Sequence, residues 1–139
     1  MTTALVTASD TARLATVAAR YVRDTPAPDP ASIMLLPGQR RIEIQPSVDF
    51  GDPVAILGAL LIWTHRLTGI TGEWWHTSGG RLHILLTGRG PCGIEFRIYS
   101  GIAYQAVRRH VVLAKGARES VTPDELYRLA LELRKGQTK

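Results

Sequence analysis

Apolar side chains first recur at helical spacing in residues 10–23. They lie three, four, seven and eight positions apart, which places them on one face of a helix. Ser9 or Asp10 is expected to cap this helix, because a short side-chain oxygen accepts the free N–H groups of the first turn. Three prolines in residues 24–31 then predict a stiff connector. The apolar positions of the helix are Leu14, Val17, Ala18, Tyr21 and Val22.

Strand-like segments follow the connector. Residues 33–36 and 41–45 flank Pro37 and Gly38 and predict a hairpin, because apolar and polar side chains alternate along its second strand. That strand is expected to have one face in water. The further strands predicted from the pattern are residues 70–77, 81–88 and 93–99.

A second helix is predicted between these two groups of strands. Asp52 is expected to cap it, with Pro53 at the first helical position and Gly69 at its end. Its sequence, PVAILGALLIWTHRL, is apolar on nearly every side until Thr64. Such a helix either crosses the middle of the domain or buries part of its surface against a second copy of the protein. In the second case the interface residues are Leu57, Leu60 and Leu61.

The C-terminal part of the chain contains one ambiguous segment and one clear helix. Residues 102–113 fit both a helical and a strand pattern, and we favour a strand because of the run VVLA at its end. Thr122 and Glu125 form a capping box around Pro123, and the apolar positions that follow predict a helix that ends at Gly136.

The order of these elements predicts the fold class. We expect a single α+β domain over residues 1–139, with a mostly antiparallel sheet of about five to six strands and three helices. A chain of this length can bury roughly two thirds of its unfolded surface without cross-links. The single cysteine, Cys92, excludes an intramolecular disulfide.

Composition narrows the choice of partner and compartment. The formal charge of +5 favours nucleic acid as a partner. However, 14 Arg, 3 Lys and no Asn are typical of a GC-rich genome, so part of this charge reflects codon usage and not a partner. The basic residues form no block longer than the pairs Arg40-Arg41 and Arg108-Arg109. The longest apolar run, 54–63, is about half of what a membrane span needs, and the first residues lack the pattern of a signal peptide. We therefore expect a soluble cytoplasmic protein that does not contact a membrane.

The alternation of side chains along a strand assigns candidate residues to the two faces of the sheet. A two-residue turn at Gly79 and Gly80 would pair His76 with His83 and place Trp75 in the core. The next turn, at residues 88–92, would set His83 opposite Arg97 and Leu85 opposite Glu95. The residues expected to bind a partner on the resulting face are Trp74, His76, Arg81, His83, Arg97 and Tyr99.

Three kinds of site could use this face. Aromatic and Arg side chains are typical of protein interfaces, and they also bind single-stranded nucleic acid. By analogy with metal-independent ribonucleases, a catalytic set would consist of His83, His76, Glu95 and Arg97, which combines an acid–base pair with a cation for phosphate. Two His and one carboxylate also suggest a metal site, but Arg97 would lie beside the ligands, so we expect no metal and no cofactor. A helix that covers this face would remove all three.

The run LHILLTGRGPCGIEFRIYSG, together with the Arg-rich composition, resembles short accessory proteins of actinobacteria and of their phages or mobile elements. This resemblance implies an origin and no activity. The leading hypothesis is a non-enzymatic accessory protein that self-associates and binds a protein partner through a sheet face or the apolar helix. The alternatives are a nucleic-acid-binding protein that uses the Arg and aromatic face, and a ribonuclease-like phosphodiesterase.

Overall fold

The computed structural model describes residues 8–48 and 51–137 and contains three helices and a six-stranded mixed sheet. The predicted α+β class, with a mostly antiparallel sheet and three helices, is confirmed. In chain order the elements are α1 (Ala8–Asp24), β1 (Ser32–Leu36), β2 (Arg41–Gln45), α2 (Pro53–Thr64), β3 (Thr68–His76), β4 (Arg81–Arg89), β5 (Glu95–Ala103), β6 (Arg118–Ser120) and α3 (Pro123–Gln137).

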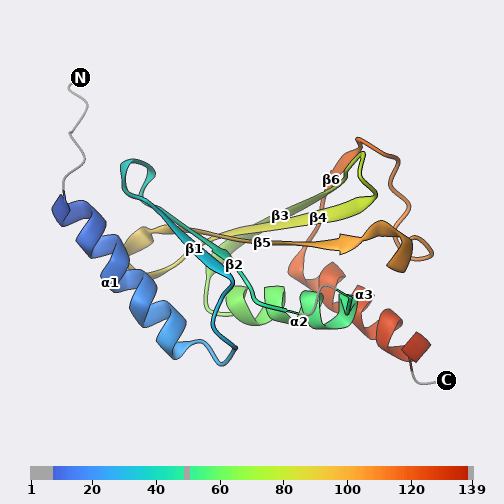
Figure 1. The fold of residues 1–139 in the computed structure, drawn as a ribbon, viewed down its shortest axis with the longest axis horizontal. Helices are drawn as coiled ribbons and strands as arrows, with labels where there is room; N and C mark the ends of the chain where they lie inside the picture. The colour runs from blue at the N-terminus through green and yellow to red at the C-terminus, as the bar shows by residue number, and fades with distance from the viewer. Residues whose placement is uncertain (1–7, 49–50, 138–139) are drawn as a thin grey trace.

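The strands lie in the order β1-β2-β5-β4-β3-β6. All neighbours are antiparallel except β2 and β5, which are parallel. Figure 1 shows the three helices on one side of this sheet. The opposite face of the sheet is not covered by any described helix, and we call it the open face.

The core forms where the alternating apolar side chains of the strands meet α2. Ile42 and Ile44 of β2, Ile84 of β4 and Phe96 of β5 are fully buried on the helix side. α2 contacts β4 and β5 of the sheet and also α3, which covers most of its apolar side chains but leaves Ile62 exposed. No helix in residues 8–48 or 51–137 is both long and apolar enough to cross a membrane.

The expectation that Leu57, Leu60 and Leu61 form an oligomer interface fails for the first two. Leu57 and Leu60 are fully buried within the single chain, so neither is available to a second copy. Leu61 is half-buried against the same core. Packing against the sheet and α3 accounts for Leu57 and Leu60, whereas Ile62 on the same helix is 43% exposed.

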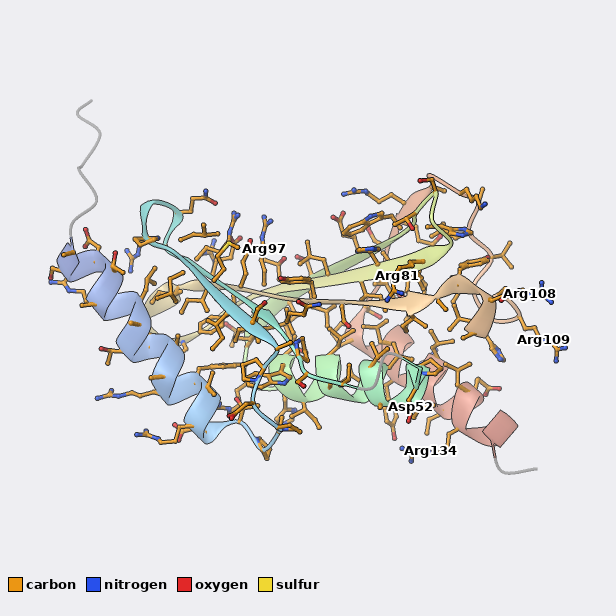
Figure 2. All side chains as sticks on the ribbon, in the orientation of Figure 1. Asp52, Arg81, Arg97, Arg108, Arg109 and Arg134 are labelled. Carbon is orange, nitrogen blue, oxygen red and sulfur yellow. The ribbon has the colours of Figure 1, made fainter. Side chains whose placement is uncertain are left out.

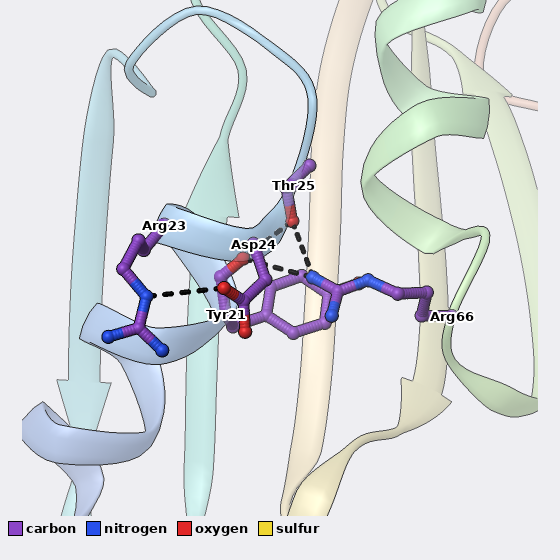
Figure 3. A network of polar contacts seen from close by, with 5 residues as sticks. All are labelled: Tyr21, Arg23, Asp24, Thr25 and Arg66. Atoms are coloured by element: carbon purple, nitrogen blue, oxygen red, sulfur yellow. Dashed lines mark hydrogen bonds and ion pairs between the residues drawn. The ribbon is translucent and has the colours of Figure 1, made fainter.

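A polar network fastens α1 to the end of α2 (Figure 3). The Arg66 guanidinium donates to the Tyr21 carbonyl at 3.1 Å and to the Thr25 hydroxyl at 2.9 Å, and it lies 4.8 Å from the centre of the Tyr21 ring. The Tyr21 hydroxyl donates to the Trp63 carbonyl, and burial raises the pKa of Tyr21 to about 12. The ring of Tyr21 also packs on Phe96, so α1 is held against the sheet beneath β2 and β5.

Two of the predicted caps are confirmed. The Asp52 carboxylate accepts the Ala55 N–H at 3.1 Å with Pro53 in the first turn. The Thr122 hydroxyl accepts the Glu125 N–H while the Glu125 carboxylate accepts the Thr122 N–H, each at 3.1 Å. Both helices therefore begin where local side-chain chemistry predicts.

Other predicted helix boundaries were wrong. Ser9 and Asp10 lie inside the first turn of α1 rather than before it. α2 ends at Thr64, and Gly69 instead lies in β3, with a φ of +59° beside an irregularity in the pairing with β4. Gly136 lies within α3, which continues to Gln137.

The strand predicted over residues 102–113 is also wrong beyond its start. β5 ends at Ala103, and a short 3-10 turn and further turns follow. The Tyr104 hydroxyl holds this segment, because it donates to the Val111 carbonyl at 2.5 Å and accepts the Leu113 N–H at 3.1 Å. The apolar residues therefore reach the core from a loop, which periodicity alone does not reveal.

Replacing Leu60 with Ala should lower the free energy of unfolding by about 2–5 kcal/mol, because it empties a fully buried site. Ile62→Ala is the matched control on the exposed side of the same helix and should cost less than about 1 kcal/mol. Urea unfolding at two protein concentrations measures both values. A loss at Leu60 that depended on protein concentration would instead place this residue in a subunit interface.

Candidate interaction surface on the open face

The turn between β3 and β4 decides which side chains reach the open face. Thr77 and Arg81 close it through an N–H to carbonyl bond of 2.8 Å, which leaves three residues in the loop. Gly80 occupies the left-handed region with a φ of +80°, and its N–H bonds to the Thr77 carbonyl at 3.1 Å. A three-residue loop with a left-handed glycine is a common hairpin connection. Because the loop has an odd number of residues, the pairing differs by one position from that of a two-residue turn.

This shift exchanges the predicted faces of β3. Trp75 pairs with His83 and Trp74 pairs with Ile84. Trp75 therefore lies on the open face, and its predicted place in the core was wrong. Trp74 and His76, predicted on the binding face, point toward the helices and are each 6% exposed.

Trp74 and His76 have structural partners on the helix side. The Trp74 indole donates to the Glu119 carboxylate at 2.8 Å. The His76 ring stacks on Tyr104 with centroids 3.8 Å apart, and its Nδ1 lies 2.7 Å from the Leu113 carbonyl. Both residues hold the loop after β5 and strand β6 against the sheet, and neither is available to a partner on the open face.

The register of β4 and β5 also differs from the predicted one. His83 lies opposite Gly101 and Arg97 lies opposite Thr87, because β4 continues to Arg89 and the connecting loop lies two residues further along the chain than predicted. His83 and Arg97 share the open face as expected, but they are four residues apart along the strands, about 13 Å. Glu95 lies opposite Arg89, still further from His83.

The predicted catalytic set is therefore not assembled. Its members are His83, His76, Glu95 and Arg97. His76 and His83 lie on opposite faces of the sheet, so they cannot act on one substrate as acid and base. In residues 8–48 and 51–137, no group of three His, Cys, Asp or Glu side chains gathers as a metal site would require.

An aromatic row crosses the open face over four strands. Gly101 of β5, His83 of β4, Trp75 of β3 and Arg118 of β6 are successive cross-strand partners. The rings of His83 and Trp75 stack with centroids 5.5 Å apart, and the Arg118 guanidinium lies 4.5 Å from the centre of the Trp75 ring. Arg118 also pairs with Glu73 at 2.8 Å. The Trp75 indole is thus held between a neighbouring ring and a cation.

Arg81 occupies the space that Gly101 leaves beside His83. Its guanidinium donates to the Gly101 carbonyl at 3.2 Å. Burial, and to a smaller extent the charge of Arg81, hold the pKa of His83 below its ordinary value. A lowered pKa favours the neutral imidazole, and a neutral ring stacks on Trp75 without the repulsion that Arg81 would exert on a cation.

A charged row lies at the other end of the open face, on β2 and β5. Arg41 forms an ion pair with Glu95 and lies 3.9 Å from Glu43. Arg97, which Figure 2 shows on the side away from the helices, lies opposite Glu43 and 3.8 Å from Glu95. Its Nε is buried and has no hydrogen-bond partner among the described residues. The row is half-buried by its own packing, and Tyr99 of β5 lies between it and the aromatic row.

The open face carries five arginines and three glutamates, which is a small excess of positive charge. These outward-facing residues are Arg41, Arg81, Arg89, Arg97, Arg118, Glu43, Glu73 and Glu95. Two hollows of the molecule lie elsewhere. One, of about 770 Å³, is lined by α1 and the turns around Arg40 and Cys92, and the other lies beside α3 near Val112.

Besides Trp75, which was predicted on the other face, two residues of the aromatic row were not anticipated from the sequence. Arg118 belongs to a strand of three residues, too short and too polar to give a strand pattern. Gly101 contributes by lacking a side chain, and only the register of β4 and β5 reveals what fills its place. Of the six predicted binding residues, the structure places Arg81, His83, Arg97 and Tyr99 on the open face.

Comparisons with protein-family models, with curated proteins and with solved structures return no match to this chain. The functional assignment of the open face therefore depends on its own residues.

The lowered pKa of His83 gives a prediction about pH. Because the folded state resists protonation of His83 while the unfolded chain accepts a proton at about 6.5, the free energy of unfolding should fall as the pH drops below that value. Followed by NMR, the His83 pKa should lie below its ordinary value and should rise part of the way back in Arg81→Gln. Burial, the larger cause, remains in that variant.

The control for this titration is Arg109→Gln, which removes the same charge from the turn after β5. It should leave the His83 titration unchanged. A His83 pKa that is insensitive to Arg81 would contradict the contact between the guanidinium and the aromatic row.

Proposed function

We propose that the protein is a non-enzymatic interaction protein that binds a protein partner through its open face. The observation that carries this proposal is the row His83, Trp75 and Arg118 on a sheet face that no described helix covers. Tryptophan, tyrosine and arginine are the residues that most often dominate the energy of protein interfaces. Tyr99 and Leu85 extend the row across β5 and β4.

The row supports binding because it is ordered before a partner arrives. The Trp75 ring is held by His83 on the neighbouring strand and by Arg118 on the other side. An anchor that is already fixed loses little side-chain entropy on association. A solvated face of an antiparallel sheet needs only polar residues, and an ordered tryptophan there is more than solubility requires.

Nucleic acid is the second candidate, favoured by the excess of arginine on the open face. Two observations make it weaker than a protein partner. Glu95 pairs with Arg41 and Glu73 pairs with Arg118, so these two arginines are already engaged. The Trp75 ring lies between His83 and Arg118, so it is not free to stack on a base. The exposed pair Arg108 and Arg109 extends from the loop after β5, beyond the end of the sheet (Figure 2).

Photocross-linking in the cells that produce the protein tests this function. A benzoylphenylalanine in place of Tyr99, which lies half-buried on the open face, should capture one protein species of defined mass. The same group in place of Tyr127, an exposed tyrosine on α3, is the matched control and should not capture it. The partner should be lost from the Tyr99 adduct when Trp75→Ala is added, because this variant removes the anchor.

Two outcomes would overturn the proposal. Equal capture from Tyr99 and Tyr127 would mean that the open face has no special affinity for a protein. Adducts that disappear on nuclease treatment, and whose yield falls steeply with salt, would favour nucleic acid instead.

A further inference from the structure

Strand β1 is the last strand of the sheet, and its outer edge has no partner among the described strands. Its sequence, SIMLL, has no charge and no proline. Ile33 on the helix side is 41% exposed and Met34 on the open face is 52% exposed. Such an edge presents free N–H and carbonyl groups beside apolar side chains, which is a template for another strand.

The opposite edge of the sheet is protected. β6 has only three residues, and two of them, Arg118 and Glu119, are charged and paired within the chain. Short length and charge are the usual means by which edge strands avoid pairing. The two edges therefore differ in the property that decides whether a further strand can add to the sheet.

We propose that β1 pairs antiparallel with β1 of a second copy, about a two-fold axis that passes midway between the two Met34 residues. Met34 is the middle residue of the strand, so this arrangement sets Met34 against its own copy and Ile33 against Leu35. Apolar side chains meet on both faces, and the free backbone groups of both edges are paired. The result is one sheet of twelve strands, with both helix layers on one side.

A second copy fits this edge for two reasons. The strand carries no charge that would select an oppositely charged peptide, and the same lack of charge removes the like-charge repulsion of self-pairing. In this register the three central positions have apolar partners, and Ser32 lies opposite Leu36 at each end. An interface of this length is small, so the dimer is expected to form at micromolar or higher concentration.

This pairing involves a surface separate from the aromatic row, and it does not depend on the proposed function. The two open faces become continuous across the β1 pair, so a repetitive or dimeric partner could be bound at two sites at once.

Light scattering after size exclusion tests the pairing. At about 100 µM the wild-type chain should have twice the mass of the 15.2 kDa monomer. Met34→Lys should be monomeric with an unchanged unfolding transition, because it places two like charges at the two-fold axis. The matched control is Val112→Lys, which changes an apolar side chain that is 90% exposed and lies away from β1. This variant should remain dimeric.

A monomeric wild-type chain, or a dimeric Met34→Lys, would overturn the pairing. A second measurement does not depend on the lysine variant. In a Cys92→Ser background, Met34→Cys should form a covalent dimer when oxidised glutathione is added, because the two Cα atoms at the axis lie within disulfide range. Ser32→Cys should not, because its copy lies about 13 Å away. Cross-linking at Ser32 but not at Met34 would exclude this register.

Discussion

The three-residue turn between β3 and β4 determines what each face of the sheet carries. With Gly80 in the left-handed region, Thr77 pairs with Arg81, and every residue of β3 takes the face opposite to the one that a two-residue turn would give it. Trp74 and His76 thereby enter the helix side, where Glu119 and the Leu113 carbonyl engage them. The core beneath β3 and the aromatic row above it both depend on this count.

The helix layer imposes the second constraint. The apolar alternation of β2, β4 and β5 gives the sheet one hydrophobic face, where α2 packs on β4 and β5 and α1 packs on β1 and β2. The other face is left with side chains that pair among themselves, such as Arg41 with Glu95 and Trp75 with His83. An open face whose members are already held in place is a suitable surface for recognition, because a partner has little left to order.

Much of the fold could be predicted because its signals are local. The capping chemistry at Asp52 and at Thr122, and the alternation along β4 and β5, depend on residues a few positions apart. The site could be predicted only in part. His83 and Arg97 were placed on one face by parity, but their separation depends on the position of the turn between β4 and β5, which parity does not fix. The turn at Gly79 and Gly80 likewise allows either of two registers.

The accessibility of the three indoles tests this account most directly. A soluble gadolinium chelate broadens NMR signals near the protein surface, and Trp→Phe variants assign each indole N–H signal. The indole of Trp75 should be broadened strongly, whereas those of Trp63 and Trp74, which are buried on the helix side, should be protected. Broadening of Trp74 with protection of Trp75 would contradict the register of the hairpin, and with it the open face on which the proposed function depends.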